Sequence, residues 1–356
     1  VLKLTRNDKS FASQAVTPNQ AAAAAAIEAG GSDSSLYMAL VGQTALGLQT
    51  GYGELDGESY ADVGSMMLEQ SDETRRSLVG RMSAPAKSQG LWVATYGDAS
   101  TADDGANFQH ARTSLGGSAS GVDFTLAGWR AGLATSVGYD ALSLTSRGAS
   151  TVDSNWTASA YAAYDGGGFD ARFGATYGWH RLASSREVAI PGYADANRSL
   201  THVTSAEAFG EIGWTWKTER GWVEPFAGVA LDTIGGFALT EAGGASALNV
   251  TTQQRTLLTE RIGVQGQTTL FGLVLHGEVA WRHASGDLSG LAQATFQSTG
   301  ESFTVHGLPI AANAAEITAG LSGKLDKRTT LDLSYHGEEG DHFSDNAMRL
   351  KAAWKF

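Results

Sequence analysis

The 356-residue chain has no cysteine, only five prolines and few basic residues. Without cysteine it forms neither a disulfide nor a thiolate zinc site, so it needs no particular redox compartment. No run of roughly 18 apolar residues occurs, which excludes a transmembrane helix of ordinary length. The net charge of −12 argues against a nucleic-acid-binding protein, which needs an extended basic face.

Recognisable catalytic and metal-binding motifs are missing as well. No serine has glycines two residues before and two after it, which excludes the nucleophile elbow of lipase-like hydrolases. HExxH, P-loop and EF-hand patterns are absent, and the eight histidines are scattered. We therefore expect no cofactor, no metal and no enzymatic activity. No signal-peptide pattern begins at Val1, and we expect the chain to be the C-terminal part of a longer exported protein.

What the sequence does contain, from Gly90 onward, is alternation of apolar and polar residues. At the end of the chain the apolar set is Met348, Leu350, Ala352, Trp354 and Phe356. The alternating segments exceed the roughly 5–6 residues of ordinary strands. They fit strands that cross a bilayer at a tilt, with lipid-facing residues alternating with polar lumen-facing ones. Average hydropathy does not detect this pattern, which explains the mean value of −0.15.

The breaks between these segments predict a closed barrel. Short breaks, such as Ala127-Gly128 and Gly166 to Gly168, alternate with longer ones, such as Pro191 to Arg198 and Asp287 to Leu308. We count about twelve strands, an even number with short turns at one rim, as in bacterial outer-membrane barrels. The predicted fold is therefore an all-β membrane protein over residues 89–356. The alternative is a soluble β-sandwich, which the strand length disfavours.

The segment before the barrel reads as helical. Residues 1–54 contain an alanine-rich helix at Asn19 to Ala29 and a second candidate at Ser35 to Leu48. Residues 55–84 contain the clearest helix, Glu58 to Met82, with acidic residues in its first turns and arginines near its end, an order that complements the helix dipole. At about 1.5 Å per residue it reaches roughly 37 Å, more than the roughly 30 Å hydrocarbon core.

Several stretches together resemble the translocator domain of monomeric autotransporters, the type V secretion family. They are Leu55 to Ala61 with the charged helix after it, Gly121-Val122-Asp123, Gly132 to Tyr139, Glu224-Pro225-Phe226, Glu260 to Gly263, Ala280 to His283, Tyr335-His336-Gly337 and Trp354-Lys355-Phe356. The resemblance covers nearly the whole chain and is specific as a set.

The resemblance implies an outer-membrane barrel with the helix of residues 55–84 in its pore. It would export an N-terminal passenger and anchor it at the cell surface. The implied partners are outer-membrane lipid, the barrel-assembly machinery, periplasmic chaperones and the passenger itself, with no nucleic acid, and we expect a monomer. We expect the assembly machinery to read the last strand through Trp354 and Phe356.

Two departures from the family pattern concern assembly and cleavage. Lys351 stands where terminal assembly signals often have glycine. The asparagine pair that some members use to cut inside the pore is absent, since only Asn7 and Asn19 precede Gly90.

Charges on the helix and the strands suggest how the helix is held. A helix threaded from outside to periplasm places Arg75, Arg76 and Arg81 near the lower rim. Strand parity places carboxylates in the lumen at Asp165, Asp170, Glu211, Glu224 and Asp332. We hypothesise that Asp165, Asp170, Glu224 and Asp332, near the same rim, hold the helix through charge-assisted hydrogen bonds. Independent solvation of these lumen charges is the alternative.

Two other functions remain open from the sequence. A diffusion porin would keep residues 1–54 in the periplasm and conduct freely. A barrel hydrolase or surface protease would need a catalytic arrangement that the sequence does not reveal. The helix of residues 55–84 favours secretion over both, because neither needs a spanning helix before its first strand.

Overall fold

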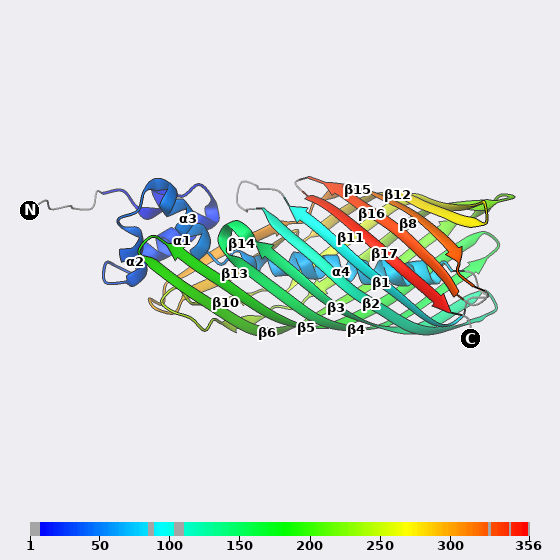
Figure 1. The fold of residues 1–356 in the computed structure, drawn as a ribbon, viewed down its shortest axis with the longest axis horizontal. Helices are drawn as coiled ribbons and strands as arrows, with labels where there is room; N and C mark the ends of the chain where they lie inside the picture. Colours follow the sequence, from blue (N-terminus) through cyan, green and yellow to red (C-terminus); the bar gives the residue numbers. More distant parts are fainter. Residues whose placement is uncertain (1–7, 85–88, 103–109, 327–328, 342, 355–356) are drawn as a thin grey trace, which may run out of the picture.

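The computed structural model describes residues 8–84, 89–102, 110–326, 329–341 and 343–354. Twelve long antiparallel strands form one closed barrel, in which the first strand, β1, pairs with the last, β17 (Figure 1). The barrel strands are β1 (Gly90–Ala102), β2 (Ala111–Leu126), β3 (Trp129–Leu144), β4 (Ala149–Gly166), β5 (Phe169–Ile190), β6 (Tyr193–Trp214), β8 (Gly221–Ile234), β11 (Arg255–Leu270), β12 (Leu273–Gly286), β15 (Asn313–Lys324), β16 (Thr329–Gly340) and β17 (Phe343–Trp354). The predicted twelve-stranded antiparallel barrel is confirmed.

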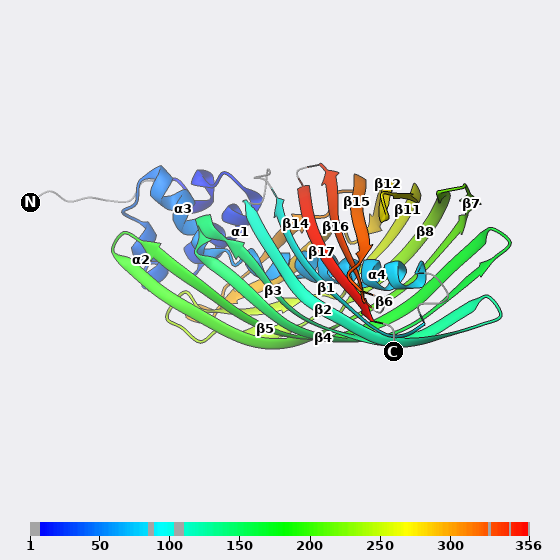
Figure 2. The same ribbon diagram turned by 45° about the vertical axis from the view of Figure 1, so that its right-hand side comes forward.

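Tight turns close the hairpins at one end of the barrel. In the pairs Ala127-Gly128, Gly167-Gly168 and Phe271-Gly272 both residues have positive φ angles. This is the pattern of a two-residue type I′ turn, whose twist matches that of the strands it joins. We call this end the short-turn end. The opposite, long-loop end carries the β5–β6 hairpin, whose two strands of 22 residues extend beyond the others (Figure 2).

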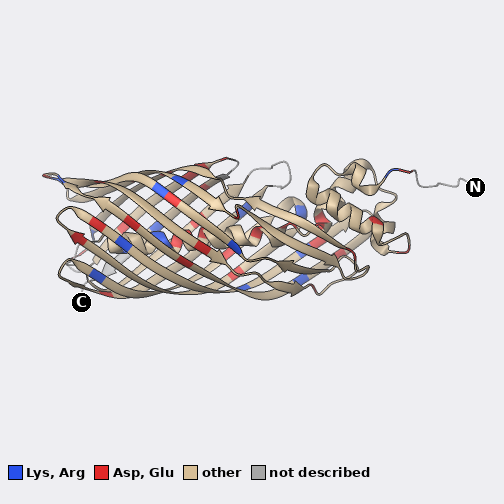
Figure 3. Cartoon of the chain, turned by 180° about the vertical axis from the view of Figure 1, so that it is seen from behind, with Lys and Arg blue, Asp and Glu red and all other residues tan. Residues whose placement is uncertain are grey.

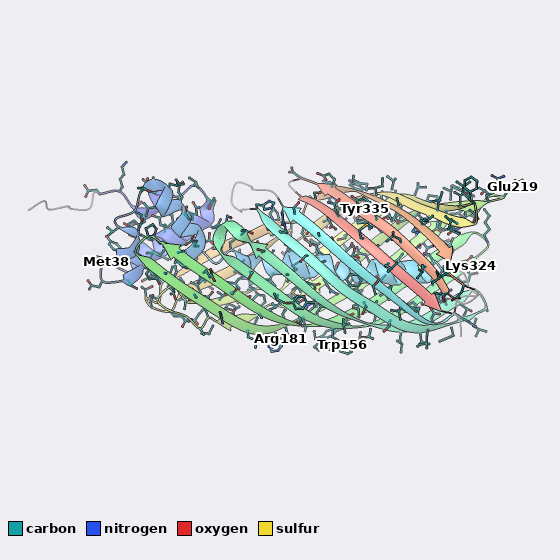
Figure 4. The ribbon with its side chains drawn as sticks, in the orientation of Figure 1. Met38, Trp156, Arg181, Glu219, Lys324 and Tyr335 are labelled. Carbon is teal, nitrogen blue, oxygen red and sulfur yellow. The ribbon has the colours of Figure 1, made fainter. Side chains whose placement is uncertain are left out.

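Side chains alternate between the two faces of the barrel wall. On β5, Phe173 and Tyr177 are exposed on the outside, whereas Arg172 and His180 are buried inside. Figure 4 shows Trp156 and Tyr335 projecting from the outer surface. The outside is thus apolar and the inside polar, which is the reverse of a soluble barrel and suits a barrel surrounded by lipid.

In the described residues before the barrel there are four α-helices, α1 (Pro18–Ala29), α2 (Ser35–Leu40), α3 (Ala45–Leu55) and α4 (Ser59–Met82), and a short 3₁₀ turn, η1 (Phe11–Gln14). A second 3₁₀ turn, η3 (Thr145–Arg147), lies between β3 and β4. α4 lies inside the barrel, while α1 to α3 pack together at the long-loop end (Figures 1 and 2). In the described part of the chain, no helix is both long and apolar enough to span a membrane.

The helix predicted over Ser35 to Leu48 is two helices in the structure. α2 ends at Leu40, and α3 begins after Thr44, whose hydroxyl accepts a hydrogen bond from the Gly47 amide at 3.1 Å. A threonine that caps the first turn favours a new helix start at that point. The cap separates two helices where composition alone suggested one.

A second, four-stranded sheet covers the long-loop end of the lumen. Its strands are β9 (Ala238–Thr240), β10 (Leu248–Thr252), β13 (Ser289–Phe296) and β14 (Ser302–Pro309), in the order β14-β13-β10-β9. They come from the β8–β11 and β12–β15 connections, parts of which the sequence suggested were loops. The sheet packs against α1 and the first half of α4. We call this sheet, with α1 to α3, the cap.

The tip of the β5–β6 hairpin is fastened to the cap by Asp195. Its carboxylate accepts hydrogen bonds from the Gly244 amide at 2.9 Å, the Ser246 amide at 3.1 Å and the Ser246 hydroxyl at 2.8 Å. Partial burial alone would raise the pKa of Asp195, but these hydrogen bonds outweigh it, and the pKa lies below its ordinary value. The charged form is therefore the one that holds the loop.

We expect this fastening to be lost in acid. A carboxyl whose folded pKa is lowered stabilises the fold above its ordinary pKa of about 3.9, and that contribution disappears as the pH falls through the folded pKa. Hydrogen exchange at the Gly244 and Ser246 amides, corrected for intrinsic rates, is expected to accelerate below about pH 4. Asp195→Asn should already exchange fast at neutral pH and show no further acid step. An acid step that persists in Asp195→Asn would assign it to another group.

Candidate functional site

The lumen contains α4, which crosses three layers of different character. Its first half, with Tyr60, Val63, Met66 and Met67, is buried in an apolar core shared with the cap. Its end enters a second apolar cluster, in which Leu78 and Met82 pack with Trp92, Tyr161 and Phe209. The segment between them, from Glu69 to Arg76, carries the charges. The apolar residues of α4 therefore form only a partial stripe along the helix.

The stretch Leu55 to Ala61 positions α4 at the mouth of the lumen. Gly57 joins α3 to α4 with a φ of +67°, and a Cβ there would lie 2.8 Å from the Leu248 side chain. On either side of it, Asp56 and Glu58 are buried, and both carboxylates form ion pairs with the guanidinium of Arg147. The same guanidinium donates a hydrogen bond to the Gly53 carbonyl at 3.0 Å. The motif therefore fixes the direction in which the helix enters.

A second arginine, Arg186 of β5, joins the helices to the cap sheet. Its guanidinium binds both carboxylate oxygens of Glu241, at 3.1 and 2.6 Å, and the carbonyl of Glu54 in α3 at 2.8 Å. Glu241 in turn accepts hydrogen bonds from the Tyr60 hydroxyl of α4 and the Leu248 amide, each at 2.7 Å. We call Arg186, Glu241 and Tyr60 the Arg186 cluster. It ties β5, the cap and α4 together at one buried point.

The charged middle of α4 is paired with the surrounding wall. Arg75 lies 2.6 Å from Glu207 of β6 and 4.0 Å from Asp232 of β8. Figure 3 shows acidic and basic residues as neighbouring segments on adjacent strands. Buried charges are tolerated only when paired, and this arrangement supplies the pairs.

The other side of the same segment pairs with the closing strands. Arg76 lies 3.6 Å from Glu338 of β16 and 3.7 Å from Glu316 of β15. Glu73 binds Arg349 of β17 through both of its oxygens, and Glu69 accepts a hydrogen bond from Ser100 of β1 at 2.9 Å. α4 therefore contacts the strands that meet where the barrel closes.

Arg81 anchors the end of the helix on Asp123 of β2. Its Nε and Nη2 donate to the two carboxylate oxygens at 2.6 and 2.8 Å. Arg130 of β3 and the Tyr161 hydroxyl bind the same carboxylate at 3.1 and 3.0 Å. The Arg81 guanidinium also lies 6.0 Å from the ring centre of Trp92. Asp123 stands in the Gly121-Val122-Asp123 motif, and its odd-numbered position on β2 puts it on the lumen face. Nothing in the sequence pattern, however, distinguishes it from the other lumen carboxylates as the partner of Arg81.

The expected partners of the helix arginines require correction. Glu211 and Glu224 do face the lumen, but both bind Arg172 of β5, at 2.8 and 2.7 Å. Asp170 accepts a hydrogen bond from the Thr215 hydroxyl at 2.5 Å, so its partner is also a residue of the barrel wall and not an arginine of the helix.

The two remaining carboxylates are also separate from the helix. Asp332 lies 2.7 Å from His276, and Asp165 is exposed beside the β4–β5 turn. Among the described residues, the helix arginines pair instead with Asp72, Glu73, Asp123, Glu207, Asp232, Glu316 and Glu338. Strand parity predicts the face of a residue, but the tilt and stagger of the strands decide its height. Arg75 and Arg76 therefore lie in the middle of the lumen and not at its rim.

The terminal residues with an expected assembly role are only partly described. Trp354 is the last residue of β17, and its backbone pairs with Thr329 of β16. The side chain of Trp354 and the whole of Phe356 lie outside the described residues.

One group of lumen residues has the hydrogen-bond pattern of a nucleophilic triad. Nδ1 of His180 lies 2.6 Å from Asp153, and its Nε2 lies 2.9 Å from the Ser205 hydroxyl. The hydroxyl is buried against β5, where a Cβ on Gly178 would lie 2.4 Å from it. A substrate carbonyl has no approach to such an oxygen, so these residues link three strands and give no support to a hydrolase.

Two spaces adjoin α4 in the part of the lumen that the structure describes. A cavity of about 310 Å³ lies beside its second half, lined by Arg76, Arg81 and Arg261 among others. A space of about 350 Å³ at the short-turn rim is lined by Asp165 and Asp170 among others. Within the described ranges, no group of three histidine or acidic side chains is arranged to hold a metal ion. α4 therefore lies in an otherwise polar channel and forms ion pairs with its wall, and we call this helix the plug.

Comparison with known proteins places this fold in context. The family model described as "Autotransporter beta-domain" matches residues 91–336. Two curated proteins named "Extracellular serine protease", both from Serratia marcescens, are each 29% identical over 90% of this chain. The chain spans about a third of their length, 32% in each case.

Solved structures share the fold at low sequence identity. The translocator domain of autotransporter NalP from Neisseria meningitidis has a TM-score of 0.67 and 14% identity, covering 83% of this chain and 98% of that one. The transport unit of AIDA-I from Escherichia coli has a TM-score of 0.53 and 14% identity, covering 75% and 91%. The β domain of the Bordetella autotransporter BrkA has a TM-score of 0.52 and 16% identity, covering 76% and 100%.

Proposed function

The chain belongs to the autotransporter β-domain family, and we propose a division of labour among its three parts. The barrel is a translocator unit of type V secretion in the bacterial outer membrane. We propose that residues 89–356 form the membrane-embedded part, that residues 55–84 occupy the pore, and that residues 1–54 form the junction to a passenger. The short-turn end then faces the periplasm and the cap faces the outside.

The observation that carries this proposal is the path of the chain. α1 to α3 lie at the long-loop end, α4 runs through the lumen, and β1 begins at the short-turn end (Figure 1). A chain that enters the pore from outside and leaves it at the periplasmic side connects an external passenger to the first strand of the barrel. The diffusion porin that the sequence left open has no use for such a path.

We further propose that the plug is held by Arg75, Arg76 and Arg81 through the carboxylates that surround them. Charge-assisted hydrogen bonds between guanidinium and carboxylate groups are stronger than neutral ones. Their burial in the lumen shields them from salt. The helix is then a stable resident of the pore after export.

The remaining partners follow from the same role. We propose that a passenger is attached upstream, that the barrel-assembly machinery recognises the last strand with Trp354 and Phe356, and that the barrel works as a monomer. The relatives are named extracellular serine proteases, and this chain spans only 32% of their length, so we propose that any protease activity belongs to an upstream passenger.

An epitope tag before Val1 tests the direction of the chain. The tagged protein is expressed behind a signal peptide, and intact cells are probed with antibody and protease. We expect the tag to be reachable from outside on a protein that resists extraction from the outer membrane. As a control, the same tag placed in the β6–β8 turn, at residues 218–220, should be reachable only after the outer membrane is breached. A tag at Val1 that stays hidden in intact cells would contradict export through the barrel and favour a diffusion porin.

A further inference from the structure

The outer surface of the barrel carries two levels of aromatic residues that mark the membrane. Phe169 and Trp214 are register partners at the short-turn end of β5 and β6. Trp156 and Trp179 stack on the neighbouring strands with their ring centres 4.4 Å apart. Phe169 and Trp179 are ten residues apart on β5, roughly 33 Å along a strand. At a tilt of 35–45° this becomes about 25 Å, the height of the apolar band of such barrels. Trp156 and Trp179 therefore lie at the outer interface.

Above these tryptophans the outer surface of β4 to β6 becomes basic. Arg181 is the next outward residue after Trp179 and pairs in register with Ser154 and His202. In Figure 4 Arg181 lies on the long-loop side of Trp156, on the outside of the barrel. Arg181 and His202 are exposed. Counted along β5, Arg181 stands about 5 Å above the upper aromatic level.

A second basic row follows further from the membrane. Ser185 of β5 pairs in register with Arg198 of β6 and with Ser150 of β4, and the two serine hydroxyls lie 3.0 Å apart. The same row continues through Ser143 to Arg112 on β2. Among the described residues, none of Arg112, Arg181 and Arg198 forms an ion pair. We call these arginines, with His202 and the serines of the two rows, the basic face.

The basic face is a local feature of an acidic protein. Toward the long-loop end of other strands, the exposed outward residues include Glu260 of β11 and Glu339 of β16. Even on β5, the next charge outward is the exposed Glu187. With a net charge of −12 over the chain, unpaired arginines gathered on one side of the membrane boundary indicate a specific anionic neighbour.

The height of the basic face above the upper aromatic level indicates which kind of lipid headgroup can reach it. Ser185, opposite Arg198, is six residues above Trp179, which is about 15 Å in height. The headgroup layer of a phospholipid leaflet is only about 5–8 Å thick. A phospholipid phosphate at the interface reaches Arg181 but not Arg198. A lipid with a tall, phosphorylated sugar headgroup reaches both.

We propose that the basic face binds the phosphorylated glycolipid of the outer leaflet, lipopolysaccharide. Arg181 and Arg198 bind its phosphates, because a guanidinium matches the geometry of phosphate oxygens. The serine hydroxyls and His202 contact its sugars, and Trp156 and Trp179 pack against the boundary between sugar and acyl chains. This inference rests only on the location in the outer membrane and is independent of passenger export.

Purified full-length chain in vesicles tests the proposal. The vesicles contain phosphatidylethanolamine with lipopolysaccharide, with dephosphorylated lipopolysaccharide, or with phosphatidylglycerol of equal charge. Two quantities are measured: the temperature at which the barrel unfolds, followed by its heat-dependent gel mobility, and the lipopolysaccharide that remains bound after extraction. We expect only intact lipopolysaccharide to raise the unfolding temperature of the unaltered protein.

The variant Arg181→Ser with Arg198→Ser is expected to lose that rise and to retain roughly tenfold less lipopolysaccharide, since each arginine supplies charge-assisted hydrogen bonds. Arg220→Ser is the matched control, because Arg220 is exposed at the opposite, short-turn end, and it should behave as the unaltered protein. Equal unfolding temperatures of all three proteins without glycolipid verify folding. A double variant that still responds fully to lipopolysaccharide, or equal stabilisation by phosphatidylglycerol, would overturn the proposal.

Discussion

Reversing Arg75, Arg76 and Arg81 to glutamate is expected to raise the single-channel conductance of the reconstituted barrel several-fold. Each new carboxylate would face Glu207, Glu316 with Glu338, or Asp123 at the distances that now hold an arginine. Breaking one buried ion pair costs about 3–5 kcal/mol, and here repulsion is added at three places. The helix then leaves the lumen and ions pass through the polar channel.

Two comparisons make this result decisive. Arg220→Glu changes an exposed turn by the same charge and should leave the conductance low. The exchange Arg81→Glu with Asp123→Arg restores one pair in the opposite sense and should conduct less than Arg81→Glu alone. The heat-dependent gel mobility of each protein reports whether its barrel has folded. A folded triple variant with unaltered conductance would show that the arginines do not hold the plug.

Arg186→Ala is expected to release the cap while the barrel stays closed. The substitution leaves the carboxylate of Glu241 buried without its cation and removes the donor to the Glu54 carbonyl. The expected loss is again about 3–5 kcal/mol, but it concerns the cap, because the barrel strands keep their hydrogen bonds. Limited proteolysis in detergent should cleave residues 18–55 many times faster than in the unaltered protein.

The natural control for this experiment lies on the same strand. Arg181→Ala removes an arginine of β5 that points outward and contributes nothing to the cap, so its cleavage rate should be unchanged. Arg186→Lys keeps the charge but lacks the fork that binds both oxygens of Glu241, and an intermediate rate is expected. Cleavage of Arg186→Ala at the rate of the unaltered protein would mean that the apolar core alone holds the cap.

The features that the sequence predicted are those encoded by local periodicity. A period of two over long segments distinguishes the barrel, and the positive-φ turns at Ala127-Gly128 and Phe271-Gly272 mark its short-turn end. The order of charge along Ser59 to Met82 likewise predicts a helix without reference to the rest of the chain. Each of these patterns lies within one element, so it can be read without knowing the fold.

The features that the sequence did not predict depend on height and on distant pairing. The parity of Glu211 and Glu224 places them in the lumen, but only the stagger of the strands shows that Arg172 lies nearer to them than the helix does. The cap sheet joins β10 to β13 from two separate connections, and neither segment alternates strongly enough to be read alone. Asp123 can be recognised as the partner of Arg81 only once the ends of both α4 and β2 are placed.

The contacts of α4 with the closing strands carry a consequence for the order of events in the life of the protein. Glu73 binds Arg349 in β17, the last part of the barrel to be synthesised, whereas Glu69 binds Ser100 in β1, the first. The contact between Glu73 and Arg349 cannot form until β17 has taken its place in the barrel. We therefore expect α4 to be held less firmly before β17 joins the barrel than after it. Complete docking of α4 in the lumen thus depends on the last strand being in place.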